Sequence, residues 1–229
     1  MRSSLGIVAS SRVRGSTNQF STNFSGYTTG SIPSDWTARW ATANVTYTVQ
    51  EVSGTLGGKV LRLAQTADAR RLISWDAVGT AATVEVLSKT RNITGGTVGT
   101  YTRIRGSGAA GAENSHDASH DYNDGGTFPN RVRLSRYLDG SFSVLERASL
   151  DLGNDVGAWL WARIQIDDGD VIRIRVWLDG TGEPGSWQIT STITTGIPAT
   201  GWVGVGTFSN NHECDYFAVG LNGETAPSP

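Results

Sequence analysis

The chain has 229 residues, a hydrophobic fraction of 38% and a formal net charge of −2. This length is compatible with one large β domain, because sandwiches and barrels commonly reach it without splitting. The 19 basic and 21 acidic residues are nearly balanced, which excludes the net basic field of a nonspecific nucleic-acid binder.

The composition favours strands and tight turns over helices, with 29 Gly and many Thr, Val, Ile and aromatic residues. Cys214 is the single cysteine, which excludes an internal disulfide. No apolar run reaches the length of a membrane span, and the opening apolar patch, residues 5–9, is too short for a convincing signal peptide. We therefore expect an all-β protein, made and folded in a cytoplasm, with no membrane insertion.

The first nineteen residues are rich in Ser, Arg and small residues and form a candidate N-terminal arm. Such a segment is either a frayed terminus or an arm that docks on a neighbouring subunit. Residues 20–222 are assigned to one β domain, and residues 223–229 to an exposed C-terminal tail. Alternating or β-rich runs predict strands over residues 45–52, 59–64, 83–90, 100–106, 130–138, 141–148, 159–167, 171–178, 201–208 and 215–221.

Two Asp-Gly pairs, Asp139-Gly140 and Asp168-Gly169, each lie between alternating runs and predict β-hairpins. In the hairpin over residues 159–178, every second residue is apolar, whereas arginines and tryptophans occupy the positions between. A period of two is expected of half-buried strands. The sheet should therefore have one apolar face and one face of arginine and tryptophan.

Residues 107–129 are polar and glycine-rich and predict a long surface loop. The loop contains histidines and aspartates, which are ordinary metal ligands, although a solvated loop and a partner contact are the alternatives. Their spacing would need a helical turn to bring both histidines to one side, and the surrounding glycines argue against one. The residues concerned are His116, Asp117, His120, Asp121 and Asp124.

Two phrases carry a family resemblance: W-x-D-G-x-x-E-P-x-x-W at residues 177–187 and D-Y-F-x-V-G at residues 215–220. Together with the hairpin before them, they resemble the concanavalin-A-like and laminin-G-like jelly-roll superfamily, over about residues 20–220. The resemblance implies a jelly-roll sandwich of two antiparallel sheets, one concave and one convex. The opening LGIVASSR and the closing DYFAVGLNGETAP also resemble virion structural proteins of tailed bacteriophages.

Hydrolases of this superfamily carry E-x-D-x-x-E or E-x-D-x-x-x-E on one strand, because glycoside hydrolysis needs two carboxyl groups across one bond. The partial match begins at Glu213 and Asp215, but Ala218 or Val219 stands where the second Glu is required. The motif is broken, so no catalytic residue and no enzymatic activity are expected. A separate acid pair brought together by the fold, for example Glu85 with Glu146, is the alternative.

Laminin-G-like domains often hold a calcium ion with loop carboxylates and backbone carbonyls, which are hard oxygen ligands. Asn23 and Asp215 occupy positions where related sequences show acidic residues. Structural calcium is the one cofactor that the resemblance implies, and Asn23 is a departure that weakens the site. Ordinary capping of turns by the two side chains is the alternative.

Arginines and aromatic residues of the predicted strands could build one concave surface, where aromatic faces stack on sugar rings and guanidinium groups bind hydroxyl or acid groups. The alternative is that these arginines stack on the aromatics and pair with acids inside a structural sheet. The candidate carbohydrate-binding residues are Trp161, Arg163, Arg173, Arg175, Trp177, Arg131, Arg133 and Tyr137, with Arg103 and Arg105 beside them.

These observations predict a non-enzymatic structural component of a phage virion, such as a capsid decoration, tail or fibre protein, made in the host cytoplasm. Its expected partners are other virion proteins and further copies of the chain, bound through residues 1–19, because virion parts work in symmetric copies. The alternative function is a carbohydrate-binding module that recognises a surface polysaccharide or receptor glycan.

Overall fold

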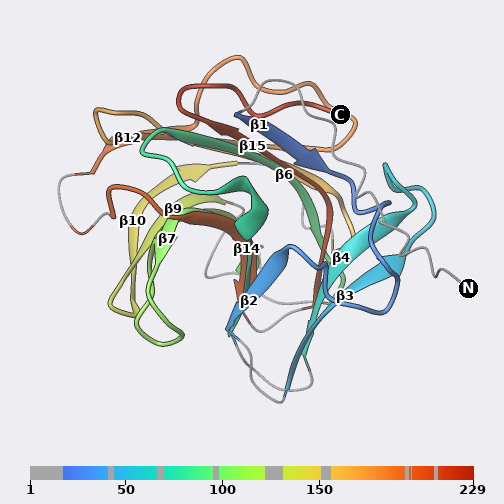
Figure 1. The fold of residues 1–229 in the computed structure, drawn as a ribbon. Coiled ribbons are helices and arrows are strands. Elements are labelled where there is room, and N and C mark those ends of the chain that lie inside the picture. Colours follow the sequence, from blue (N-terminus) through green and yellow to red (C-terminus); the bar gives the residue numbers. More distant parts are fainter. Residues whose placement is uncertain are drawn as a thin grey trace, which may run out of the picture.

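The computed structural model describes residues 18–40, 44–65, 70–94, 98–121, 131–150, 156–193, 196, 198–208 and 211–229, with the backbone alone for residues 98, 99 and 121. Within these ranges the chain forms fifteen strands and one short 3-10 helix, Asp76–Val78. No helix there is long and apolar enough to cross a membrane. The strands build two antiparallel sheets that pack face to face (Figure 1).

Sheet A has eight strands in the order β13-β12-β11-β6-β15-β4-β3, and β1 pairs with the second half of β15. Its long central strand β15 therefore has β6 along one side and both β4 and β1 along the other. The strands are β1 (Gln19–Thr22), β3 (Val45–Glu51), β4 (Lys59–Gln65), β6 (Val84–Asn92), β11 (Leu160–Ile166), β12 (Val171–Leu178), β13 (Ile189–Thr192) and β15 (His212–Leu221).

Sheet B has seven strands in the order β10-β9-β8-β7-β14-β5-β2. It curves beneath sheet A, so that its outward side is the concave side of the molecule (Figure 1). The strands are β2 (Trp36–Trp40), β5 (Arg70–Trp75), β7 (Val98–Ser107), β8 (Asn114–Asp121), β9 (Arg131–Leu138), β10 (Ser141–Ser149) and β14 (Trp202–Phe208). The prediction of an all-β jelly roll with two antiparallel sheets is confirmed.

The main core lies between the sheets and follows the alternation seen in the sequence. From β11 and β12 it takes the apolar side chains of Ala162, Ile164, Ile166, Ile172, Ile174 and Val176. An aromatic group fills one part of it: Trp36 stacks on Trp75 with ring centroids 5.6 Å apart, and Phe217 packs edge-on to Trp36 at 5.2 Å. Stacked and edge-on aromatic pairs stabilise a core beyond the area they bury.

Both Asp-Gly hairpins form, but their turns differ. At the first, Asp139 and Gly140 have φ of 47° and 76°, the two positive values of a type I′ turn. At the second, the positive φ of 55° belongs to Asp170 and not to Gly169. The Asp167 carboxylate accepts hydrogen bonds from the backbone N–H groups of Gly169 and Val171, and so holds this longer loop.

The prediction of a long loop over residues 107–129 was wrong for strand β8, Asn114–Asp121. Its Ala118 belongs to the core, and His116 and His120 lie on the same side of the strand. A strand places residues i and i+4 on one face, so no helical turn is needed to bring these histidines together. Because polar residues occupy both faces of β8, its sequence lacks the alternation of apolar and polar residues that predicts a strand.

The segment assigned to an exposed tail, residues 223–229, instead lies across the outward face of sheet A. Ala226 is 2% exposed, and its backbone N–H donates to Glu85 Oε1 at 3.0 Å. The Tyr216 hydroxyl donates to the Pro227 carbonyl at 2.9 Å. The tail therefore covers part of a sheet face that would otherwise be open to solvent.

Residues 1–17, most of the predicted arm, lie outside the described ranges. Gln19, its last residue, begins strand β1 and pairs with Gly220 of β15. The role of the arm in assembly stays a prediction.

Candidate functional site

The structure divides the predicted carbohydrate surface between the outward faces of two different sheets. Trp161, Arg163, Arg173, Arg175 and Trp177 belong to β11 and β12 of sheet A. The other members, Arg131, Arg133 and Tyr137, belong to β9 of sheet B. Since the core separates these faces, the eight residues do not form one surface.

On sheet A, the tryptophans of the predicted set are part of a second hydrophobic cluster. Trp161 and Trp177 are stacked, with ring centroids 6.1 Å apart, and Tyr216 packs edge-on to Trp161. Both tryptophans are less than 9% exposed. Ala226 of the C-terminal segment closes the cluster. These aromatic rings are therefore packed against the protein and do not present a face to a sugar.

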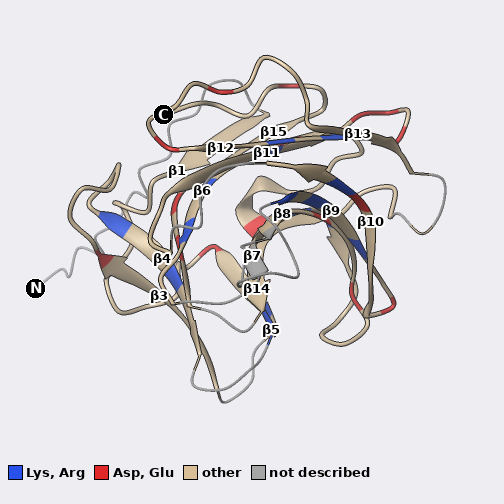
Figure 2. Ribbon diagram, turned by 180° about the vertical axis from the view of Figure 1, so that it is seen from behind, with Lys and Arg blue, Asp and Glu red and all other residues tan. Residues whose placement is uncertain are grey.

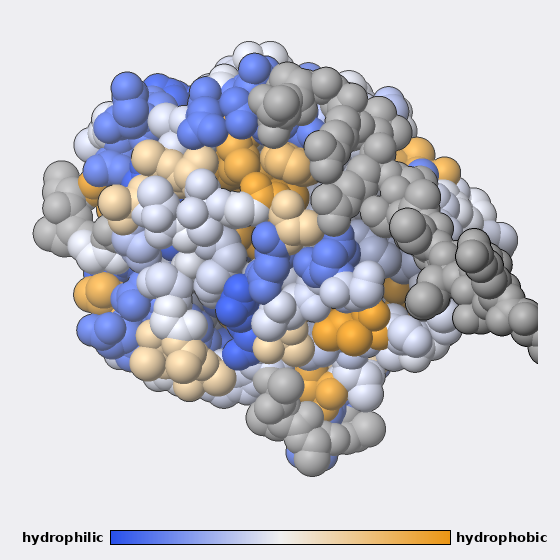
Figure 3. Space-filling model, in the orientation of Figure 1, coloured by the Kyte–Doolittle hydropathy of each residue, from blue (hydrophilic) through white to orange (hydrophobic). Residues whose placement is uncertain are grey.

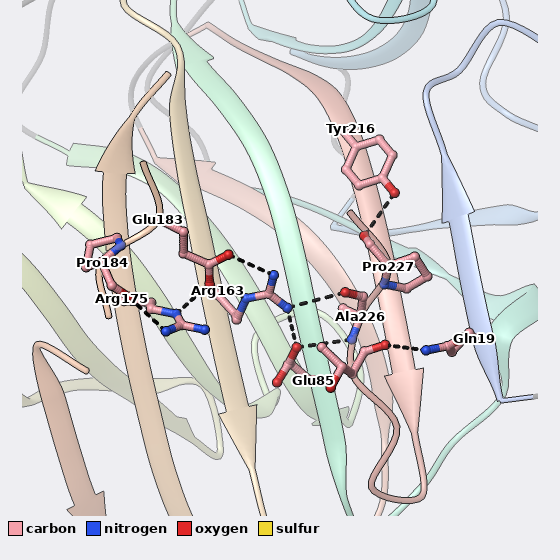
Figure 4. A network of polar contacts seen from close by, with 10 residues as sticks. Gln19, Glu85, Arg163, Arg175, Glu183, Pro184, Tyr216, Ala226 and Pro227 are labelled. Carbon is pink, nitrogen blue, oxygen red and sulfur yellow. Dashed lines mark hydrogen bonds and ion pairs between the residues drawn. The ribbon is translucent and has the colours of Figure 1, made fainter. Parts of the chain in front are cut away.

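Arg163 is held in an ion-pair network beside this cluster (Figure 4). Its guanidinium Nη1 donates to Glu85, and its Nε donates to Glu183 Oε1 at 2.6 Å. Arg175 pairs with the same Glu183 at 2.5 Å and donates to the Pro184 carbonyl. Burial alone would lower the pKa of Arg163, but Glu183 and Glu85 raise it above its usual value. The network matches the structural alternative for these arginines.

On the concave side, sheet B carries a continuous series of arginines and aromatic rings. The guanidinium carbons of Arg70 and Arg103 lie 4.3 and 4.5 Å from the ring centroid of Tyr137. Farther along, that of Arg133 lies 5.4 Å from Tyr101. We call this set the concave ladder; its members are Trp40, Arg70, Tyr101, Arg103, Arg133, Tyr137 and Phe142.

Cross-strand register explains how these side chains reach one face. Tyr137 is paired with Ser115 of β8 and Phe142 of β10, and Arg103 of β7 is paired with Asp117 of β8. Directly paired residues point to the same side of a sheet. The ladder is thus assembled from strands that are far apart in sequence, with Arg70 reaching Tyr137 from β5.

The floor of the concave ladder is buried and only partly hydrogen-bonded. Arg103 and Asp117 are both fully buried, with Arg103 Nε 3.1 Å from Asp117 Oδ1. Burial raises the pKa of Asp117, although Arg103 and Ser115 lower it. The two terminal nitrogens of Arg103, Asp117 Oδ2 and the hydroxyls of Ser119 and Ser135 have no hydrogen-bond partner among the described residues. Such groups normally meet water or a ligand.

The outer parts of the ladder are accessible. Trp40 is half-buried, and Phe142 is 43% exposed. The Arg70 side chain pairs with Glu113 at 2.7 Å and keeps 17% of its surface exposed. Figure 3, in the orientation of Figure 1, shows apolar residues in several separate groups between hydrophilic ones. Because Trp40, Arg70 and Phe142 are the accessible members of the ladder, contacts to a partner on the concave side would be mixed aromatic and polar.

The side-chain oxygens of the two predicted calcium ligands, Asn23 and Asp215, form contacts with other protein groups. Asn23 Oδ1 accepts hydrogen bonds from the backbone N–H and hydroxyl of Ser25. Asp215 Oδ1 accepts from the Leu56 N–H at 2.9 Å, and its Oδ2 lies 3.2 Å from Lys89 Nζ. An ammonium group beside the carboxylate competes with a cation, so this donor set does not fit calcium. Within the described residues, His, Cys, Asp and Glu form no group of three suited to a metal ion.

The acidic residues considered as a possible glycoside-hydrolase pair do not lie on opposite sides of a common cleft. Glu213 pairs with Arg62 and Arg91 on sheet A, away from the concave side. Glu85 lies on β6 of sheet A, whereas Glu146 lies on β10 of sheet B. Neither the broken motif nor the alternative pair forms a two-carboxylate site.

Solved structures share this fold. A carbohydrate-binding module from Bacillus subtilis, CBM66, aligns with a TM-score of 0.55 and 17% identity, over 85% of this chain and 96% of that one. A Bacillus subtilis protein of unknown function with a galectin-like fold gives 0.56 and 10%, over 82% and 89%. The carbohydrate recognition domain of Emp46p gives 0.52 and 8%, over 83% and 90%.

These identities show the fold alone: a jelly-roll sandwich of the kind that carbohydrate-binding and lectin-like domains have. No protein-family model and no curated protein matches the chain. None of the three structures is described as a virion protein, so the phage resemblance gains no support from them. The virion role and location stay predictions.

Sequence reasoning missed four members of the ladder: Trp40, Arg70, Tyr101 and Phe142. Trp40 and Arg70 belong to strands β2 and β5, which were not predicted. Tyr101 and Phe142 lie on predicted strands, and the alternation there does place them on one face. The signal that was absent is the pairing order of the strands, because β10, β9, β8 and β7 become neighbours of β14, β5 and β2 only in the folded sheet.

Proposed function

We propose that this protein is a non-catalytic glycan-binding domain that binds its ligand on the concave side of sheet B. The observation that carries the proposal is the concave ladder, in which half-buried Trp40 and exposed Phe142 flank arginines stacked on tyrosine rings. Its fold, which carbohydrate-binding modules also have, adds support.

The chemistry of the ladder suits a sugar. An aromatic ring packs against the apolar C–H face of a pyranose or furanose, while planar guanidinium groups donate paired hydrogen bonds to ring substituents. Tyr137 is 3% exposed and Arg103 is fully buried, so the members of the ladder that a ligand can contact are Trp40, Arg70 and Phe142. The Arg70 guanidinium packs on the Tyr137 ring and is therefore ordered before a ligand arrives. Groups ordered in advance lose less entropy on binding.

Replacing Trp40 with alanine is expected to weaken glycan binding at least about tenfold, since aromatic anchors commonly contribute 2 kcal/mol or more at a binding surface. Trp187→Ala is the matched control: Trp187 also stacks with an arginine, Arg175 at 4.2 Å, but on sheet A. Retardation of the full chain in gels that contain individual polysaccharides measures both variants against the parent protein.

Equal binding by the parent and Trp40→Ala, with loss in Trp187→Ala, would place the ligand on sheet A and overturn the proposal. Failure of the parent chain to bind any polysaccharide or oligosaccharide of a broad panel would overturn glycan binding itself. Thermal unfolding of each variant separates a lost contact from a lost fold.

A further inference from the structure

We infer that the glycan bound on the concave side is anionic, carrying carboxylate or sulfate groups. This inference rests on the glycan-binding function proposed above and adds the chemical class of its ligand. It follows from the charges that sheet B gathers on its outward face.

Arginines outnumber acids on this face, although the chain as a whole has a net charge of −2. Figure 2 shows basic segments along β5, β9 and β10. The count below covers only residues whose side chains the structure describes. The arginines are Arg39, Arg70, Arg103, Arg131, Arg133 and Arg147, and the acids are Asp76, Glu113 and Asp117.

Three of these arginines lie together on two adjacent strands. Arg147 of β10 is directly paired with Arg133 of β9, and Arg131 is two residues farther along β9. Directly opposed like charges destabilise a sheet pair. Arg133 is close enough to Asp117 to lower the pKa of that carboxyl, whereas Arg147 has no such acid among the described ion pairs. The cost of opposing like charges is expected where function requires it.

Arg147 has charge available for a ligand. In the part of the chain that the structure describes, it forms no ion pair, whereas Arg39, Arg70 and Arg103 pair with Asp76, Glu113 and Asp117. Arg147 is exposed and is directly paired with Arg133, whose guanidinium carbon lies 5.3 Å from the centroid of the Phe142 ring. It therefore lies on the same pair of strands as the exposed Phe142, where the charged substituents of a bound glycan could reach it.

The residue type points the same way. All basic residues on this face are arginines, and the guanidinium fork matches the planar oxygen pairs of a carboxylate and the oxygens of a sulfate. Charge-assisted bonds of this kind are roughly twice as strong as neutral ones.

The test compares polymers that differ only in charge. Polygalacturonate and its methyl ester share one backbone, as do dextran sulfate and dextran. Binding of the full chain should be at least about tenfold tighter for a charged polymer than for its neutral form, and should weaken as salt rises. The carboxylate and sulfate pairs separate the two sources of negative charge.

Arg147→Gln should reduce the preference for the charged polymer by about tenfold, while Arg173→Gln on sheet A should leave it unchanged. Equal binding of charged and neutral polymers would overturn the anionic class but keep the proposed function. Absence of binding to any glycan would overturn both. Equally tight binding of polyphosphate would also overturn the inference, because the face would then recognise charge without sugar.

Discussion

Replacing Arg163 with alanine is expected to lower the free energy of unfolding by about 3–5 kcal/mol, the usual cost of breaking a buried ion pair. The side chains of Arg163 and Glu85 are 4% and 7% exposed. Without the guanidinium, Glu85 would retain a buried charge beside the backbone of Ala226. Urea unfolding monitored by tryptophan fluorescence measures the change.

Arg173→Ala is the matched control, from the same sheet and the same predicted glycan set. Arg173 pairs with Asp167 at 2.7 Å, but both side chains are 28% exposed, so the cost should stay below about 1 kcal/mol. Arg163→Met combined with Glu85→Gln should recover much of the lost stability, because no unpaired buried charge remains. Similar small losses for Arg163→Ala and Arg173→Ala would show that Arg163 is not structural.

The contrast between these arginines explains what the sequence could and could not predict. Period-two alternation correctly placed Arg163 and Arg173 on one face of a hairpin. It contains no information about what covers that face. The loop with Glu183, which directly follows the hairpin, and the segment with Ala226, from the C-terminal end of the chain, bury Arg163 while Arg173 stays near solvent.

The fold was predictable because apolar and polar residues alternate along its long half-buried strands. Short strands such as β1 and β13, of four residues each, are too brief to show a period. Strands β5 and β8 were not predicted for another reason. Buried polar residues, Arg71 and His116 among them, occupy positions where the alternating pattern of a strand would have an apolar side chain. The site depended on these missed strands, which is why only part of the ladder was foreseen.

The three buried histidines make the stability of the protein depend on pH. His116, His120 and His212 are the only histidines of the chain, and each is less than 5% exposed. Burial lowers the pKa of His116 and His120 to about 4 and of His212 to about 3. Nearby arginines lower two of them further: Arg136 and Arg105 face His116, and Arg71 faces His212.

The sign of the pH effect follows from where the proton binds. In the unfolded chain these histidines take up protons near pH 6.5, whereas in the folded protein they stay neutral down to about pH 4. The unfolded state therefore binds more protons in this window, and stability falls as the pH drops below 6.5. Burial also raises the pKa of Asp117 and Asp215, and these two carboxyls act in the opposite direction, since their protonation favours the folded state.

We expect the free energy of unfolding to be nearly constant from about pH 7 to 8 and to fall by several kcal/mol, on the order of 1–3 per histidine, as the pH drops from 6.5 toward 4.5. The chain has no other histidine, so the whole histidine contribution to the slope of stability against pH comes from buried side chains. Urea unfolding at half-unit pH steps measures it, and His120→Gln, whose pKa is lowered by burial only, should flatten the slope by about one third of its value. A stability that does not change between pH 7 and 5 would contradict the burial of all three side chains.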